Sequence, residues 1–266
     1  MTRIIDFHAH LDERWFHVPC DSPSSMVATL DRFEVEAACV FTIMGFYEDC
    51  IPHNEALLRR ANEYPDRLIP FVTVDPKLGR AAVDELERCL ANPRFRGIKF
   101  HPWLQAFASS MLRNTMMDIL HVAAQHQVPI LLHDGTPPYS TTYQVADLAR
   151  WSPKTIIVLG HAGSADYVSP AAQLIREIPN LYGCFCGPRP GDLEHLVALG
   201  GAEKIIFGSD FGAAGWRLLP ERIDNVTEAK LTPAELDLIL YGNSVRLLKL
   251  DEFPLTATAS SAGGKR

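Results

Sequence analysis

The sequence predicts a single α/β domain that folds as an eight-stranded parallel (β/α)₈ barrel, the TIM-barrel architecture. Short apolar segments with strand-like composition alternate with segments of helical hydrophobic periodicity through residues 1–252. No linker-like break divides this stretch, and 47% of the 266 residues are apolar, enough for one large core. An open doubly wound sheet is the competing architecture, but no G-x-G-x-x-G motif follows the first strand.

Each predicted strand is a run of four to seven mainly apolar residues, typical of strands buried on both faces of a parallel sheet. Eight such strands in a chain of this length suit one closed barrel better than two domains. The expected strands are residues 4–10, 37–43, 68–74, 96–100, 128–132, 155–159, 181–186 and 204–207.

The helices are predicted from apolar residues at helical spacing, such as Leu57, Leu58 and Ala61 in the second helix, which Pro65 ends. The expected helices are residues 26–36, 54–64, 80–90, 112–126, 142–150, 165–178, 191–199, 219–230, 233–240 and 242–250. Residues 253–266, rich in Thr, Ala, Ser and Gly near their end, are expected to form a disordered tail.

The composition argues against nucleic acid or a membrane as a partner. The net charge is −7 without a basic block, and the apolar runs are too short for a transmembrane helix. The first strand begins at once, which leaves no room for a signal peptide. Six cysteines without a C-x-x-C pair indicate reduced thiols. We therefore expect a cytoplasmic protein that acts on a small molecule, either as a monomer or as a homo-oligomer.

The first predicted strand carries the strongest chemical signal. Strand alternation places Asp6, His8 and His10 on one face. Two imidazoles two residues apart can converge on one metal ion, since each offers a neutral nitrogen lone pair. The alternative is an ordinary strand with two polar residues at its solvent end.

Four more polar side chains follow the ends of later strands. They are His101, His133, His161 and Asp210, after the fourth, fifth, sixth and eighth strands. In a parallel barrel the carboxyl ends of all strands face the same mouth, so these residues are expected to converge with His8 and His10.

The chain resembles the amidohydrolase superfamily, and more narrowly the amidohydrolase-related group that includes aminocarboxymuconate-semialdehyde decarboxylase-like enzymes. The stretches that carry the resemblance are IIDFHAH, NEALLRRANEYPDRLIPFVTVDP, RGIKFHP, ILLHDG, LGHAG, IIFGSDF and YGNSVRLL. The resemblance implies a metal held by His8, His10, His133 and Asp210. It also implies that His161 is a general acid or base, or a ligand of a second metal.

Three imidazoles and a carboxylate suit one Zn²⁺ ion, with Mn²⁺ or Fe²⁺ as alternatives. Metal-bound water would then be acidic enough to attack a substrate, with Asp210 accepting its proton. Hydrolysis of a small ester, lactone or amide, one that bears a carboxylate, is therefore the favoured function. Non-oxidative decarboxylation of an aromatic or unsaturated acid is the main alternative. A metal-free lactonase and a catalytically silent barrel are the remaining alternatives.

Several residues keep two interpretations. Lys99 and His101 share a strand face. The resemblance allows a carboxylated Lys99 that bridges two metal ions. An unmodified Lys99 would instead pair with an acidic side chain or bind an anionic substrate. Arg189 and Arg217 could clamp a substrate carboxylate or remain solvated. Side chains that could line a pocket for an apolar ring are Trp15, Trp103 and Tyr139. Cys186 is interpreted as a buried thiol and Asp6 as a partner of a ligand.

Overall fold

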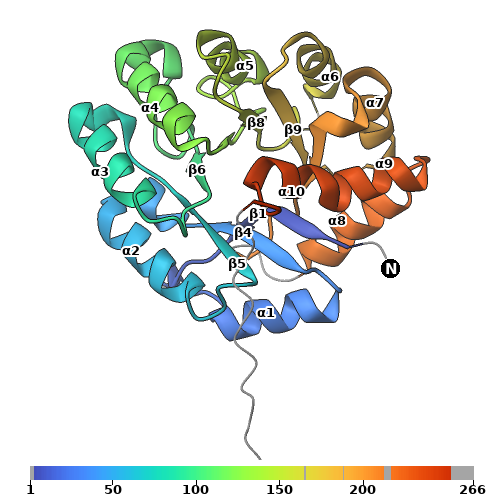
Figure 1. Ribbon diagram of the computed structural model, residues 1–266, viewed down its shortest axis with the longest axis horizontal. Helices are drawn as coiled ribbons and strands as arrows, with labels where there is room; N and C mark the ends of the chain where they lie inside the picture. Colours follow the sequence, from blue (N-terminus) through green and yellow to red (C-terminus); the bar gives the residue numbers. More distant parts are fainter. Residues whose placement is uncertain (1–2, 165, 188, 213–216, 253–266) are drawn as a thin grey trace, which may run out of the picture.

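The protein is an eight-stranded parallel barrel surrounded by helices, as predicted (Figure 1). This computed structural model describes residues 3–164, 166–187, 189–212 and 217–252; the predicted tail, residues 253–266, lies outside the described residues. Neighbouring strands follow one another in chain order around the sheet. The ring closes between its first and last strands, where Ala9 forms a parallel bridge with Phe211 and the His10 backbone N–H donates to the Phe211 carbonyl over 2.8 Å.

The strands are nearly all buried along their length, because helices cover their outer face and side chains fill the barrel. They lie within the predicted segments and are shorter, since pairing stops where the chain turns away at each end. Their bounds are β1 Ile5–His10, β4 Ala37–Phe41, β5 Leu68–Val72, β6 Gly97–Phe100, β7 Ile130–Leu132, β8 Ile157–Leu159, β9 Leu181–Phe185 and β10 Ile205–Phe207.

The helices follow the strands in the predicted order. They are α1 Pro23–Arg32, α2 Cys50–Ala61, α3 Arg80–Leu90, α4 Arg113–His126, α5 Thr142–Trp151, α6 Val168–Glu177, α7 Pro190–Gly200, α8 Leu218–Thr227, α9 Pro233–Asp237 and α10 Asn243–Leu248. Short 3₁₀ turns are η1 Met44–Phe46, η2 Pro76–Leu78, η3 Ser109–Leu112 and η4 Ala202–Lys204, and η5 Leu238–Gly242 is a π-helical segment. No helix in the described parts of the chain is long and apolar enough to cross a membrane.

Helix α1 begins three residues before the predicted start. Ser22 caps it by accepting a hydrogen bond from the Ser25 backbone N–H, and Pro23 occupies the first turn, where its missing N–H costs nothing. The helix ends before Glu34, which adopts a left-handed conformation with φ of 57°.

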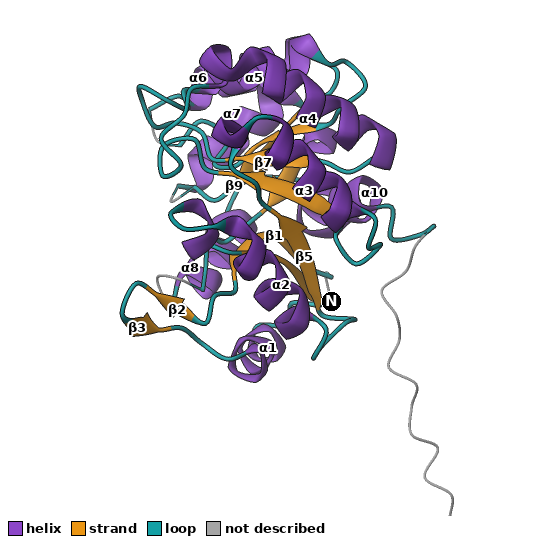
Figure 2. Cartoon of the chain, turned by 90° about the vertical axis from the view of Figure 1, so that its left-hand side faces the viewer, coloured by secondary structure: helices purple, strands orange, loops and turns teal. Residues whose placement is uncertain are grey.

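A small hairpin, β2 Arg14–Trp15 and β3 Val18–Pro19, projects from the loop after β1 (Figure 2). The predicted strands do not include it, because two-residue strands carry no periodicity. Arg14 fixes it by donating to both carboxylate oxygens of Glu48, over 3.0 and 2.9 Å. The ring of Phe16 also contacts that of Tyr47, with centroids 5.1 Å apart.

Apolar side chains fill the inside of the barrel below its carboxyl end. Phe7 and Phe71 meet edge to face at a centroid distance of 5.5 Å, and Leu131, Val158 and Ile206 complete this layer. Because the interior is packed, the polar strand-end residues can meet only above it, at the mouth.

Asp6 joins the two strands at which the barrel closes. Its side chain is fully buried and accepts hydrogen bonds from the backbone N–H groups of His8 and Ser209, each over 3.0 Å, and from the Ser209 hydroxyl over 2.5 Å. Burial raises the pKa of Asp6 to about 7, although these three donors oppose the shift. Asp6 therefore positions the backbone around His8 and the end of β10.

We expect Asp6→Ala to lower the free energy of unfolding by about 2–4 kcal/mol, because it leaves two buried backbone N–H groups without an acceptor. Urea unfolding followed by circular dichroism measures the change. Asp6→Asn retains one acceptor oxygen and should lose less stability. Equal stability of Asp6→Ala and wild type would contradict this role.

Candidate active site

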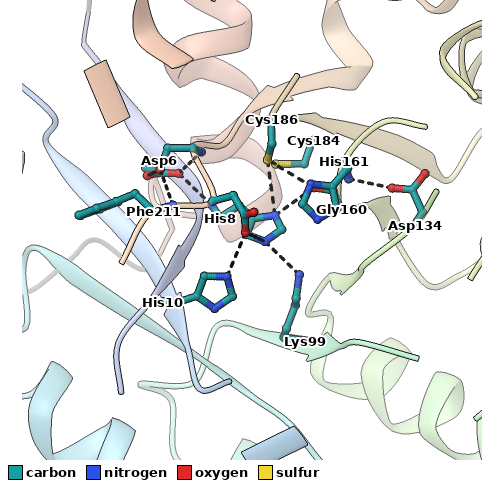
Figure 3. A network of polar contacts seen from close by, with 12 residues as sticks. Asp6, His8, His10, Lys99, Asp134, Gly160, His161, Cys184, Cys186 and Phe211 are labelled. Atoms are coloured by element: carbon teal, nitrogen blue, oxygen red, sulfur yellow. Dashed lines mark hydrogen bonds and ion pairs between the residues drawn. The ribbon is translucent and has the colours of Figure 1, made fainter. Parts of the chain in front are cut away.

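His8 lies at the centre of the polar cluster at the barrel mouth (Figure 3). Its Nδ1 is 2.9 Å from the Gly160 carbonyl oxygen, which can only accept a hydrogen bond, so Nδ1 carries the proton. Its Nε2 is therefore a lone-pair donor, and it lies 3.1 Å from Asp210 Oδ1. Burial lowers the pKa of His8 to about 4, which keeps the imidazole neutral at pH 7.

His10 and Asp210 complete a compact set of ligand atoms with His8. His10 Nε2 lies 3.0 Å from the same Asp210 oxygen, and the ligand atoms of the three residues lie within 4.8 Å of one another. Burial opposes ionisation of Asp210, but the polar groups around it, among them His10 Nε2 at hydrogen-bond distance, outweigh burial and hold the pKa of this carboxyl well below its usual value. The Asp210 backbone adopts a left-handed conformation, with φ of 62°, and its side chain lines the cavity.

The donor set fits a divalent cation. The Nε2 lone pair of His8 and a carboxylate oxygen face each other at 3.1 Å, an arrangement that positive charge stabilises, either from a bound cation or from the Lys99 ammonium nearby. His10 Nδ1 is buried with no hydrogen-bond partner in the described structure. Two imidazoles and a carboxylate are ligands that Zn²⁺ and Mn²⁺ both accept.

Lys99 is the only lysine that lines the cavity among the described residues. Its side chain is 1% exposed, and its Nζ lies 3.2 Å from His8 Nε2 and 4.5 Å from the centroid of the Phe41 ring. Burial lowers the pKa of Lys99 to about 8, with Asp210 opposing the shift. Lys99 therefore places a positive charge beside the ligand cluster.

His133, His161 and His101 surround this cluster without joining it. His133 Nε2 lies 2.7 Å from the Thr136 hydroxyl, and its ring stacks on that of His101 at 3.8 Å. The ring of His161 lies 4.9 Å from that of His8 and 4.5 Å from that of His133. Thus three of the four predicted ligands converge closely, and His133 lies in the same cavity with its Nε2 directed to Thr136.

Asp134 and Thr136 were not singled out from the sequence. The buried Asp134 carboxylate accepts hydrogen bonds from the backbone N–H groups of His161, over 2.7 Å, and Gly163, over 2.8 Å. Burial raises its pKa to about 6 despite these donors. The ILLHDG stretch placed an Asp beside His133, but its partners come from the next loop and leave no sequence signal.

A cavity of about 190 Å³ opens above the cluster. Its polar lining comes from the histidines, Lys99 and Asp210, and its apolar wall from Trp15 on the hairpin, Ile43 and Leu104. The polar lining residues are His8, His10, Lys99, His101, His133 and Asp210.

The structure places the two candidate arginines at the surface. Arg189 is exposed and pairs with Asp192 over 2.7 Å, and Arg217 is exposed as well. Neither contributes to the lining of the cavity, and neither do Trp103 and Tyr139.

The amidohydrolase sequence profile matches residues 5–250, so the chain belongs to the amidohydrolase family. Comparison with curated proteins finds no match.

Three similar solved structures are decarboxylases. The 2,6-dihydroxybenzoate decarboxylase from Rhizobium is 17% identical, with a TM-score of 0.72 over 94% of this chain and 99% of that one. The 5-carboxyvanillate decarboxylase from Sphingomonas paucimobilis is 12% identical, with a TM-score of 0.74 over 94% and 99%. The dihydroxybenzoic acid decarboxylase from Polaromonas sp. JS666, which holds manganese and the inhibitor 2-nitroresorcinol, is 18% identical, with a TM-score of 0.72 over 94% and 97%. At these identities the likeness shows a common fold.

Because the buried imidazoles are neutral in the folded protein, we expect the free energy of unfolding to depend on pH. Burial, with His133 and Lys99 adding to it, lowers the pKa of His101 far below the unfolded value near 6.5. As pH falls below 6.5 the unfolded chain takes up a proton that the folded chain does not, so folding loses stability. In metal-free protein, His101→Leu should remove roughly 2 kcal/mol of the change in unfolding free energy between about pH 7 and pH 5.

Urea unfolding of wild type and variant at both pH values tests this. The difference between the two proteins is the readout, because the raised pKa values of Asp6 and Asp134 act in the opposite direction in both. His126→Leu, at an exposed position, is the control for the loss of a histidine side chain outside the site. The same pH dependence in His101→Leu and wild type would show that His101 titrates normally.

Proposed function

We propose that this enzyme decarboxylates a small aromatic or unsaturated carboxylic acid, with one divalent metal, rather than hydrolysing an ester, lactone or amide. The observation that carries the proposal is the cavity, which combines a buried ammonium group, a cluster of metal ligands and an apolar wall that includes Trp15 in about 190 Å³. A cavity of roughly 150 Å³ holds benzene. This one therefore suits a single substituted ring better than the acyl and leaving groups of an ester.

The relatives support this choice over hydrolysis. The three solved structures described above are decarboxylases of hydroxylated or methoxylated benzoic acids, and one of them holds manganese. We propose that His8, His10, His133 and Asp210 hold the metal in this chain, with His133 turning from Thr136 to do so. When bound, the ion would polarise a substrate oxygen and stabilise negative charge that develops during the reaction.

The other residues of the site then have separate roles in the proposed reaction. The Lys99 ammonium binds the anionic substrate, because an ion pair in this buried cavity is screened little by water. Trp15, Ile43 and Leu104 pack against the ring and exclude water. The bond between the ring carbon and the carboxyl carbon breaks, its electron pair stays on the ring carbon, and a proton replaces the departing CO₂. We propose that His161, whose backbone N–H donates to Asp134, relays this proton from solvent.

Product analysis tests the reaction class. The enzyme, loaded with Mn²⁺ or Zn²⁺, is incubated with a panel of hydroxybenzoates, lactones and esters in deuterated water. We expect release of CO₂ and one deuterium in the aromatic product. Asp210→Asn should lower kcat/KM at least about 100-fold with an unchanged circular dichroism spectrum, because it removes the only charged ligand. Incorporation of ¹⁸O from labelled water without CO₂ release would establish hydrolysis instead.

Replacement of Lys99 tests its role as the anion-binding group. Lys99→Met keeps the volume of the side chain but removes the charge, and we expect KM for a carboxylate substrate to rise about 10- to 100-fold. Metal content should stay near one ion per chain, with Arg189→Met as the exposed control. Two ions in wild type and fewer in Lys99→Met would instead make Lys99 a metal ligand.

A further inference from the structure

A second group of potential ligands lies on the opposite side of the His8 ring from Asp210. Cys186 directly follows β9, and its Sγ lies 3.4 Å from the Gly160 oxygen and 3.6 Å from His8 Nδ1 (Figure 3). Cys184, two residues earlier on the same face, has its Sγ 3.9 Å from that of Cys186. Two thiols therefore lie behind the His8 ring, outside the lining of the cavity, and the proposed reaction does not use them.

His161 completes this group. Ligand atoms of His8, His161 and Cys186 all lie within 4.8 Å of one another, and they come from three different parts of the barrel. Cys186 and His8 are buried, at 7% and 1% exposure. A nitrogen–nitrogen–sulfur set of this size is the kind of site that holds a thiophilic cation.

Gly208 leaves the space that the thiols occupy. A Cβ at this position would lie 2.4 Å from Cys184 Sγ and 3.0 Å from Cys186 Sγ, closer than atoms pack. The sulfur atoms can approach the histidines only because position 208 has no side chain.

We propose that His8, His161 and Cys186 form a second cation site, selective for thiophilic ions such as Cd²⁺ or excess Zn²⁺, and distinct from the His8–His10–Asp210 cluster. Selectivity follows from ligand type, because thiolate favours soft ions and carboxylate favours hard ones such as Mn²⁺. When an ion binds, a metal–sulfur bond forms and the thiol proton of Cys186 leaves to solvent. His8 binds the ion through Nδ1, so the Nδ1 proton leaves to solvent too and the hydrogen bond to Gly160 is lost.

The two sites share His8, and this makes the second site inhibitory. The hydrogen bond to Gly160 fixes the His8 ring and keeps Nε2 directed at Asp210. An ion on the thiol side removes this bond and places a second positive charge near the first site. A thiophilic ion should therefore weaken binding of the Mn²⁺ ion in the other cluster.

Cadmium absorption spectroscopy tests the site in the full-length protein. All titrations use a Cys20→Ser background, since Cys20 is the one cysteine of the six that is not buried. Protein loaded with Mn²⁺ is titrated with Cd²⁺, and thiolate-to-cadmium charge transfer is followed in the ultraviolet. We expect one saturable band, with release of Mn²⁺ as it develops.

Variants identify the sulfur ligand. Cys186→Ser should lose the band, whereas Cys184→Ser, the adjacent thiol on the same strand face, and Cys89→Ser, a distant buried thiol, should retain it. His161→Gln should weaken the apparent Cd²⁺ affinity about tenfold or more. A band that persists in Cys186→Ser, that is lost in Cys184→Ser, or that is absent from the parent protein would overturn the proposal.

A measurement without variants keeps the proposal testable if Cys186→Ser does not fold. Anomalous diffraction from wild-type crystals soaked in Cd²⁺ should show a peak beside Cys186 Sγ. A cadmium peak at Asp210 alone would refute the second site. Because neither experiment measures turnover, the outcome is independent of the proposed decarboxylase activity.

Discussion

The closure of the barrel between β1 and β10 is the constraint on which the site depends. The Asp210 backbone N–H donates to the His8 carbonyl over 2.8 Å, and the Asp6 carboxylate holds Ser209 from the other side. These contacts join residues about two hundred positions apart in the sequence. Without these contacts the distance between the side chains of His8 and Asp210 would not be fixed, and the ligand cluster would not form.

Burial sets the electrostatics of this junction. It lowers the pKa of His8 to about 4 and that of His133 to about 3, so that their lone pairs remain available, while the polar groups around Asp210 hold the pKa of this carboxyl low and keep it ionised. Lys99 contributes a positive charge within 3.2 Å of a ring nitrogen of His8. The cavity thus combines a site for a cation with a site for an anion, which is the combination that a metal-dependent reaction of a carboxylate requires.

His8 has a different environment on each of its two nitrogens. Nε2 faces a carboxylate, an imidazole and an ammonium group, whereas Nδ1 faces a carbonyl and a thiol. One side chain therefore links the cluster used by the proposed reaction to the two thiols behind the His8 ring. Both the orientation of the ring and its protonation depend on the Gly160 carbonyl, a backbone group whose contact with His8 the sequence does not specify.

The sequence by itself determined the barrel, the order of its elements and the family. Hydrophobic periodicity is a local property, so eight strands and their helices could be located, and α3 at Arg80–Leu90 matches its predicted bounds. Strand-end positions also placed His8, His10, His133, His161 and Asp210 at one mouth, because parallel topology brings carboxyl ends together.

Only the tertiary structure decided which of these residues touch. In the structure His133 lies apart from the compact cluster, and Lys99 is buried against His8. Arg189 lies at the surface, and Cys186 lies beside His161. The hairpin that carries Trp15 to the cavity also emerged only there. Such contacts depend on loop paths and side-chain packing between distant segments, and neither of these is encoded in the local spacing of residues.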